Sequence, residues 1–361
     1  MNVRKNISTI EYANARIRGH RAQLFDAAFY EGLLSTHSLQ EVINILEGTK
    51  YRAVLSKNLL LHSGASAVGY AATAYFSEEF RFCAQFYTER QERSIEVLAA
   101  DLDVQDFKTV VRGKFAGASY EDIVAHFAGP GLFIPRAQLR TLARQKSLED
   151  VVTTALALMV PFAKELKVGA EQYAISEALI DFDMSLDHAY FDWARTRTEH
   201  LSSQSSPIRA YVIGRIDAQN IMTLARFATS KDATNTVRSI ERFYIPGGSI
   251  FPTVKTFMKA SDAQSLEELS QRIKSPRFAR IIMQQSAEYH LSGSLVSLDH
   301  ALRQQIRTAA ISVGKMQIDS IGVCIAYLLA LENEVTNIRL IAHAKAFNVE
   351  NTDIKKELMG V

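Results

Sequence analysis

An internal threefold repeat is the feature that most constrains how this chain of 361 residues can fold. A short motif of serine, leucine, any residue, an acid and an aliphatic residue begins at Ser38, Ser147 and Ser265. A serine three residues before an acid is typical of a capping box, in which both side chains bind free backbone N–H groups at a helix start. Apolar residues follow at helical spacing in each copy. The motif therefore predicts three equivalent helix starts.

A second marker recurs later in each repeat. It opens with an acid, Asp103, Asp217 or Glu334, and has an Asp or Asn three residues further on. A basic residue or histidine follows nine residues after the acid. Acid first and base last is the order that the helix dipole favours, so each copy predicts a helix.

Two further markers keep the same period. Proline–glycine turns stand at residues 130–131 and 246–248, and the pentapeptide Ser-Leu-Asp-His-Ala occurs at residues 185–189 and 297–301. Such turns break a helix and separate units. Four markers in one order indicate three copies of a helical unit of roughly 115 residues. We therefore expect three similar domains, residues 1–127, 128–243 and 244–361, in a pseudo-threefold arrangement.

Composition agrees with an all-α fold, because only 7 prolines and 17 glycines interrupt a chain dominated by helix-forming residues. The net charge of +2 does not imply a polyanionic partner. Cys83 and Cys324 lie among apolar neighbours, which favours a core position in a reducing, cytoplasmic compartment. The longest apolar stretches, residues 151–163 and 321–331, are shorter than the roughly 20 residues needed to span a bilayer. A direct membrane span is therefore not expected.

A basic helix is predicted from Tyr12 to Phe25, with Arg16, Arg18 and Arg21 close together. Basic clusters of this kind occur in nucleic-acid-binding proteins. Aromatic residues that could stack on bases do not alternate with these arginines, so a solvated or protein-binding face is the favoured interpretation. We expect no nucleic-acid partner.

Neither a nucleotide site nor a metal site is predicted. Gly314-Lys315 is followed by methionine and lacks the upstream glycine of a phosphate-binding loop. The acids Asp181, Asp183 and Asp187 lack the glycine and final glutamate of a calcium loop.

The two pentapeptide histidines are candidates for chemistry, although a packing role is favoured. His188 has Asp192 one helical turn later, whereas His300 has Gln304 at that place. An acid that would orient both histidines therefore does not recur. We predict no catalytic residue, no cofactor and no bound metal.

Several segments together resemble a known family. They are Tyr12-Ala13-Asn14-Ala15-Arg16-Ile17-Arg18, Ile216-Asp217-Ala218-Gln219-Asn220-Ile221, the Pro246-Gly247-Gly248 turn and Asn333-Glu334-Val335-Thr336-Asn337-Ile338-Arg339. In this order the chain resembles the C subunit of the archaeal and bacterial V/A-type rotary ATPases, which is the relative of the eukaryotic d subunit. The first repeat departs from the pattern, because it lacks the pentapeptide.

The resemblance implies an all-helical funnel of three domains on the cytoplasmic side of the membrane. Its expected partners are the central-shaft subunits and the membrane rotor ring of the complex. The chain would be a peripheral, non-catalytic rotor component that transmits torque for ATP-coupled ion transport. The alternative hypothesis is a helical enzyme or small-ligand carrier that uses the interdomain cavity.

Candidate partner-binding residues come from the repeated polar helices and from the basic N-terminal helix. Capping groups and ordinary solvated charges are the competing interpretation of the same residues. The candidates are Arg16, Arg18, Arg21, Asp103, Arg112, Asp217, Arg226, Glu334 and Arg339.

Overall fold

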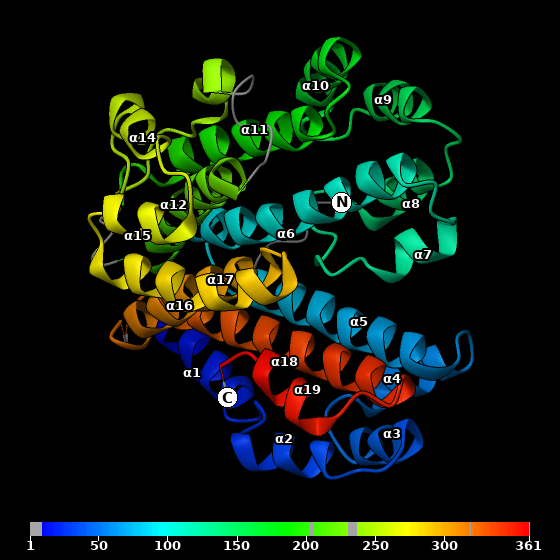
Figure 1. Ribbon diagram of the computed structural model, residues 1–361. Coiled ribbons are helices and arrows are strands. Elements are labelled where there is room, and N and C mark those ends of the chain that lie inside the picture. Colours follow the sequence, from blue (N-terminus) through cyan, green and yellow to red (C-terminus); the bar gives the residue numbers. More distant parts are fainter. Residues whose placement is uncertain (1–8, 202–205, 230–236, 318, 361) are drawn as a thin grey trace. The chain divides into compact units, whose positions relative to one another are not determined.

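The computed structural model describes residues 9–201, 206–229, 237–317 and 319–360. Within these ranges the chain is helical and has no β-strand (Figure 1). The predicted all-α class is therefore confirmed. None of the described helices is both long enough and apolar enough to cross a membrane.

Among the described residues, the α-helices are accompanied by one 3-10 helix, η1. In chain order they are α1 (Ile10–Arg21), α2 (Ala27–Leu34), α3 (Leu39–Glu47), α4 (Arg52–Leu59), α5 (Gly64–Ala84), α6 (Glu89–Phe115), α7 (Tyr120–Ala125), α8 (Arg136–Ala143), α9 (Leu148–Ala157), α10 (Ala163–Ser176), α11 (Ile180–Thr198), α12 (Pro207–Thr229), η1 (Val237–Phe243), α14 (Val254–Ala260), α15 (Leu266–Arg272), α16 (Pro276–Ser292), α17 (Val296–Lys315), α18 (Gly322–Ala346) and α19 (Asn351–Glu357).

The three repeated serines are N-caps, as their motif predicts. Each side-chain hydroxyl accepts a backbone N–H from the third residue of its helix. The bonds join Glu41 N to Ser38 at 3.3 Å, Asp150 N to Ser147 at 3.1 Å and Glu268 N to Ser265 at 3.2 Å.

The acids of the first and third copies bind a different N–H from the one that a capping box predicts. Glu41 accepts the backbone N–H of His37 at 2.9 Å, and Glu268 accepts that of Gln264 at 3.0 Å. Each carboxylate thus accepts the N–H of the residue that precedes the N-cap serine. The side-chain hydrogen bonds at these two helix starts therefore extend to one residue before the N-cap.

The first helix is shorter than the sequence predicts. It begins at Ile10 and ends at Arg21, so Phe25 lies beyond it. The backbone N–H of Phe25 donates to the carboxylate of Glu334, 309 residues later. This long-range bond takes the place of a helical one and directs the chain away from α1.

The three long helices α6, α12 and α18 each pack against a helix from another repeat. Lys108 of α6 forms a buried ion pair with Asp187 of α11. Tyr327 of α18 donates its hydroxyl to Glu79 of α5 at 2.8 Å, and α18 lies along α5 in Figure 1. The third long helix therefore packs against the first repeat.

The remaining pair, α12 and α17, follows the same rule. A Cβ added to Gly214 of α12 would lie 3.0 Å from the side chain of Ile306 on α17, so the glycine permits close approach. Each long helix thus packs against the helix that precedes the next long helix, in cyclic order. This pairing extends the sequence repeat into packing.

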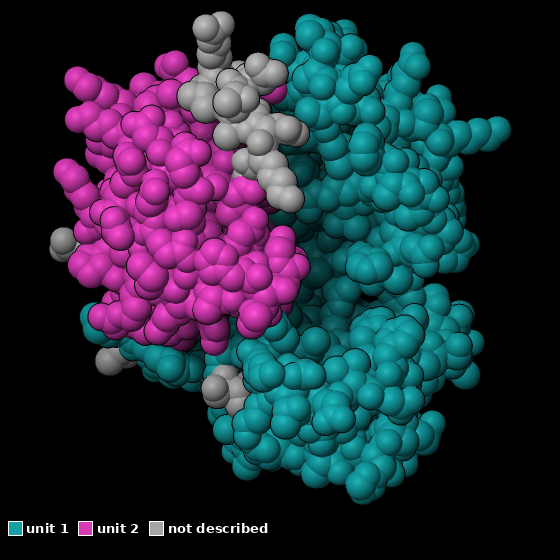
Figure 2. Space-filling model, in the orientation of Figure 1, with its two compact units in different colours: residues 1–190, 314–361 teal, residues 191–313 magenta. Residues whose placement is uncertain are grey.

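The chain divides into two compact units, which Figure 2 shows in different colours. The first contains residues up to 190 together with residues from 314 onward, and the second contains residues 191–313. Both limits fall inside the helix that precedes a long helix, α11 or α17, rather than at the proline–glycine turns. Packing therefore groups α12 with the helices that follow it. The three-domain division at residues 127 and 243, and the funnel arrangement, stay predictions.

Candidate functional site

The repeated acid of α6 binds the turn that follows α7. Asp103 is fully buried, and its carboxylate accepts four consecutive backbone N–H groups, from Gly131 at 2.7 Å, Leu132 at 2.9 Å, Phe133 at 2.8 Å and Ile134 at 3.1 Å. Gly131 has φ +66, a left-handed conformation that favours glycine. The turn is therefore shaped by one carboxylate.

Asp106, one helical turn further along α6, binds the residues just before this turn. Its two carboxylate oxygens accept the N–H groups of Ala128 at 2.8 Å and Gly129 at 3.0 Å. Burial raises the pKa of Asp106 to about 7 and that of Asp103 to about 6. Arg136 and the backbone donors oppose this rise for both acids.

The same positions of α12 bind the second turn. The Asp217 carboxylate accepts the hydroxyl of Ser249 at 2.6 Å and the N–H of Ile250 at 2.9 Å. Asn220 makes two bonds to one residue, because its amide donates to the carbonyl of Ile245 at 2.8 Å and its oxygen accepts the N–H of Ile245 at 2.9 Å. Burial raises the pKa of Asp217.

In the third repeat, Asn337 of α18 has the role of Asn220. Its amide donates to the carbonyl of Met359 at 2.9 Å, and its oxygen accepts the N–H of Met359 at 2.8 Å. This is the same two-bond pattern that Asn220 makes with Ile245. The C-terminal segment therefore takes the place of the residues that precede the turn in the other repeats.

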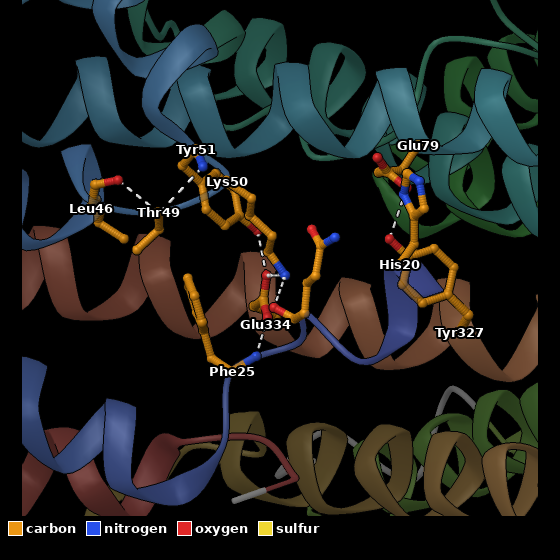
Figure 3. Close-up of polar contacts among 10 residues, drawn as sticks. His20, Phe25, Leu46, Thr49, Lys50, Tyr51, Glu79, Tyr327 and Glu334 are labelled. Carbon is orange, nitrogen blue, oxygen red and sulfur yellow. Dashed lines mark hydrogen bonds and ion pairs between the residues drawn. The ribbon is translucent and has the colours of Figure 1, made fainter. Parts of the chain in front are cut away.

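Glu334 of α18 completes the third copy by binding the opposite end of the chain (Figure 3). Its carboxylate accepts the N–H of Phe25 at 2.7 Å and the hydroxyl of Tyr51 at 2.7 Å, and it pairs with Lys50 Nζ at 2.7 Å. The Glu334 and Lys50 side chains are only 2% and 9% exposed. Two segments from opposite chain ends thus replace the continuous turn of the other repeats.

A second buried acid joins α1, α5 and α18. Glu79 of α5 accepts the hydroxyl of Tyr327 at 2.8 Å and contacts His20 Nδ1 at 2.9 Å (Figure 3). His20 also stacks on Phe82 with ring centroids 4.1 Å apart. Together, Glu79 and Glu334 attach the N-terminal helices to α18.

Asp106→Asn is expected to remove part of the pH dependence of stability. A buried acid whose folded pKa is raised binds more protons in the folded state, so its contribution is complete below the unfolded pKa of about 4 and is lost as pH rises through the folded value of about 7. Between pH 5 and pH 8, the wild-type chain should lose about 2–3 kcal/mol relative to the variant. Urea unfolding of the wild-type and variant chains at each pH measures this difference. If the two free energies of unfolding change in parallel with pH, the prediction is contradicted. The equivalent positions of the other two repeats hold asparagine, at Asn220 and Asn337.

The arginines of the candidate set lie in different surroundings. Arg112 is exposed and pairs with Asp183 at 2.8 Å. Arg339 donates to the carbonyls of Phe127 at 2.9 Å and Ala125 at 3.1 Å, where it stabilises the end of α7. Arg226 is exposed near the end of α12.

On α1, Arg16 and Arg18 are exposed, whereas Arg21 is half-buried. The Arg16 guanidinium lies over the rings of Phe82 and Phe86, at 5.8 and 6.0 Å from their centroids. The predicted partner-binding residues thus comprise four exposed arginines, the half-buried Arg21 and Arg339, and three buried acids. Partner binding by any of them stays a prediction.

The acids considered for a metal bind within the chain. Asp183 pairs with Arg112, Asp187 pairs with Lys108, and Asp181 accepts the hydroxyl of Ser176. The described residues contain no cluster of three His, Cys, Asp or Glu side chains that could hold a metal. His188 and His300 are both half-buried and both have partners within the chain.

Two described cavities lie in the first unit. A cavity of about 340 Å³ is lined by α5, α6 and the turn residues Leu132 and Phe133, and a smaller one of about 150 Å³ lies beside Arg339. Neither set of lining residues contains a histidine or a cysteine.

Lys50 and Lys108 were not found from the sequence, although both form buried ion pairs. Lys50 is separated from Glu334 by most of the chain, and Lys108 has no counterpart at the equivalent position of α12, which is Met222. The sequence did contain a signal for the contacts between acid and turn. Asp103 and Asp217 each precede a proline–glycine turn by about 30 residues, so the acid and the turn recur together.

These features define a class of protein: a helical repeat chain whose buried acids and amides bind its own backbone. A family model described as the ATP synthase (C/AC39) subunit matches residues 13–357. The chain therefore belongs to this family, and the predicted membership is confirmed.

Known relatives cover almost the same length. The chain is 24% identical to the C subunit of the A-type ATP synthase of Haloquadratum walsbyi, over 98% of this chain and 99% of that protein. It is 23% identical to the corresponding A-type protein of Methanocaldococcus jannaschii, over 99% of this chain and 88% of that protein. It is also 23% identical to the C subunit of the V-type ATP synthase of Deinococcus radiodurans, over 97% of this chain and 91% of that protein.

Membership determines the kind of function. The family is a non-catalytic component of the rotary ATPase, so the chain is a subunit of a membrane-associated rotary ATPase complex rather than an enzyme in its own right. The enzyme alternative is thereby set aside.

Proposed function

We propose that this chain is the coupling component that joins the central shaft of the rotary ATPase to its membrane rotor ring. It is peripheral, lies on the cytoplasmic side of the membrane, and transmits torque between ATP turnover and ion transport. The observation that carries the proposal is family membership over residues 13–357. The packing of each long helix against a helix from another repeat is consistent with it.

A torque-transmitting part has to resist bending, and the internal contacts support this requirement. Each turn between repeats is bonded to a long helix through buried polar groups, and the two chain ends are bonded to α18. Buried polar groups that are fully bonded favour one arrangement over competing ones. The polar repeat thus supports stiffness in every copy.

The candidate set is then divided by exposure. We assign partner contact to the exposed arginines Arg16, Arg18, Arg112 and Arg226, because charged side chains at an interface rim select and orient a partner. We assign the buried Asp103, Asp217 and Glu334, and the half-buried Arg339, to holding the helices that present this surface.

Coupling is the property to test. Membranes depleted of this chain should retain ATP hydrolysis by the head but lose ATP-driven ion transport, and purified chain should restore transport. The heat-denatured chain is the control. Ion transport at the full rate in depleted membranes would contradict the proposal. The purified chain alone is expected to show no ATP hydrolysis.

A further inference from the structure

One exposed side of α1 has an unusual composition for a helix face in contact with water. Tyr12, Ala15, Arg16 and Gly19 follow one another at i, i+3, i+4 and i+7, and all four are exposed. A solvated helix face is normally rich in charged side chains, whereas these four residues, here called the α1 stripe, carry one charge. The stripe therefore has the composition of a surface that packs against another element.

Gly19 is not required by any contact within the described chain. It lies inside α1, and a Cβ added there would meet no atom within 4 Å. Glycine inside a helix is less favourable than alanine. The distance between two packed helices depends on the side chains at their contact, so a glycine at this place allows a second helix to approach closely.

Arg16 is positioned by aromatic rings of α5 rather than by an acid. Its guanidinium lies over Phe82 and Phe86, at 5.8 and 6.0 Å from the ring centroids. No ion pair joins Arg16 to another residue of the described chain. An arginine that lies over aromatic rings keeps the N–H groups at its edge available for a carboxylate. The stripe thus presents one positioned positive charge.

The aromatic rings beneath Arg16 are occupied by contacts within the chain. His20 stacks on Phe82 with ring centroids 4.1 Å apart, and Arg16 lies over the same ring. Phe86 meets Phe82 and Tyr12 edge to face, at 4.9 and 6.2 Å. Stacking on nucleic-acid bases needs free ring faces. The arrangement therefore favours a protein partner over a single-stranded nucleic acid.

We propose that the α1 stripe docks a helix of another subunit of the complex, which places a carboxylate on Arg16 and packs closely over Gly19. This inference rests on the proposed function, which assigns partner contact to Arg16, and it adds the chemistry of the partner surface. The one charge of the stripe is positive, so the complementary face presents an acid among small or apolar side chains. Arginine and tyrosine are also enriched among the residues that dominate binding energy at interfaces.

The first experiment measures how tightly the full-length chain rebinds to membranes depleted of it. Arg16→Glu should weaken rebinding by more than about tenfold, because it replaces an attraction by a repulsion. Gly19→Leu should weaken rebinding by at least about tenfold, since its side chain blocks close approach of the partner helix. The same variant should raise the urea unfolding midpoint of the free chain, because leucine favours a helix more than glycine does. A structural role for Gly19 would lower that midpoint instead.

Two residues outside the stripe provide matched controls. Arg52 is exposed in the first turn of α4, and Gly32 lies in α2 with no atom within 4 Å of an added Cβ. Arg52→Glu and Gly32→Leu should therefore rebind with wild-type affinity.

The second experiment identifies the group that binds Arg16. Arg16→Lys keeps the charge and should retain rebinding. A carbodiimide then joins the introduced amine to a carboxylate in contact with it, forming an amide while the reagent takes up the elements of water. Mass spectrometry of the digested complex should locate that carboxylate on a helix of another subunit. A crosslink from residue 16 only to acids of this chain would overturn the inference.

The outcomes separate the inference from the function on which it rests. Wild-type affinity of Arg16→Glu and Gly19→Leu for depleted membranes overturns the inference. Loss of binding to a fluorescent single-stranded oligonucleotide in Arg16→Glu, in place of a loss of membrane binding, also overturns it. In both cases the wild-type chain still rebinds, so the coupling function stands. A wild-type chain that does not rebind to depleted membranes contradicts both. An unaltered unfolding midpoint verifies that Arg16→Glu is folded.

Discussion

Glu334→Ala is expected to lower the free energy of unfolding by about 3–5 kcal/mol, the usual cost of removing one partner of a buried ion pair. The change leaves Lys50 without its counter-charge in a site where burial already lowers the lysine pKa. It also leaves the Phe25 N–H and the Tyr51 hydroxyl without their acceptor. Urea unfolding measures the loss.

Hydrogen exchange should show where the structure opens. Amides of α1 and α2 are expected to exchange faster than those of the second unit, because Glu334 attaches the segment between these two helices to α18. Glu31→Ala is the matched control, since Glu31 of α2 also pairs with a lysine, Lys355, but both side chains are more than half exposed. It should cost less than about 1 kcal/mol. Equal losses from the two variants would contradict the role assigned to Glu334.

A double variant tests whether the unpaired charge causes the loss. Glu334→Leu with Lys50→Met replaces both charged groups by apolar ones of similar size, and such replacements of buried pairs are often neutral or stabilising. We therefore expect the double variant to be more stable than Glu334→Leu alone. The reverse order would show that the hydrogen bonds to Phe25 and Tyr51 dominate.

Asp103→Ala is the second change with a large expected effect, about 2–4 kcal/mol. Four consecutive N–H groups lose one shared acceptor, and that of Ile134 is buried away from water. Hydrogen exchange of residues 131–134 should accelerate well before the rest of the unit opens. Urea unfolding gives the total cost.

Two other aspartates provide the comparison. Asp217→Ala removes one backbone bond and one serine bond, so its cost should be smaller than that of Asp103→Ala. Asp192→Ala is the surface control, because Asp192 is exposed and pairs only one turn along its own helix, with Arg195. An Asp103 variant as stable as the Asp192 variant would show that the turn keeps its shape without the carboxylate.

Local rules predicted the parts of this fold that depend on neighbouring residues. Ser38, Ser147 and Ser265 cap their helices because a serine oxygen reaches an N–H only three residues away. The buried positions of Cys83 and Cys324 also follow from their apolar neighbours. Helix class, caps and period are therefore readable from one sequence.

Bonds between distant residues were not predictable in the same way. The sequence identified Asp103, Asp217 and Glu334 as equivalent, but their acceptor roles depend on which segment the fold brings to them. For Glu334 that segment includes Phe25, 309 residues earlier in the chain. The same bond explains why α1 ends at Arg21.

The compact units also differ from a division at the proline–glycine turns for a physical reason. A turn marks where the chain changes direction, whereas a compact unit is the set of segments that make most of their contacts with one another. Asp187 of α11 forms its ion pair with Lys108, from the preceding repeat, so buried contact crosses the repeat boundary that the turn marks. Repeat and packing unit are therefore offset along the chain.

A bridging capture is the decisive measurement for the coupling role. Purified rotor ring is immobilised, the central-shaft subunits are added with and without this chain, and the captured shaft is quantified. We predict that shaft is retained only when the chain is present. Capture of shaft by ring at the same level without the chain would contradict the coupling role.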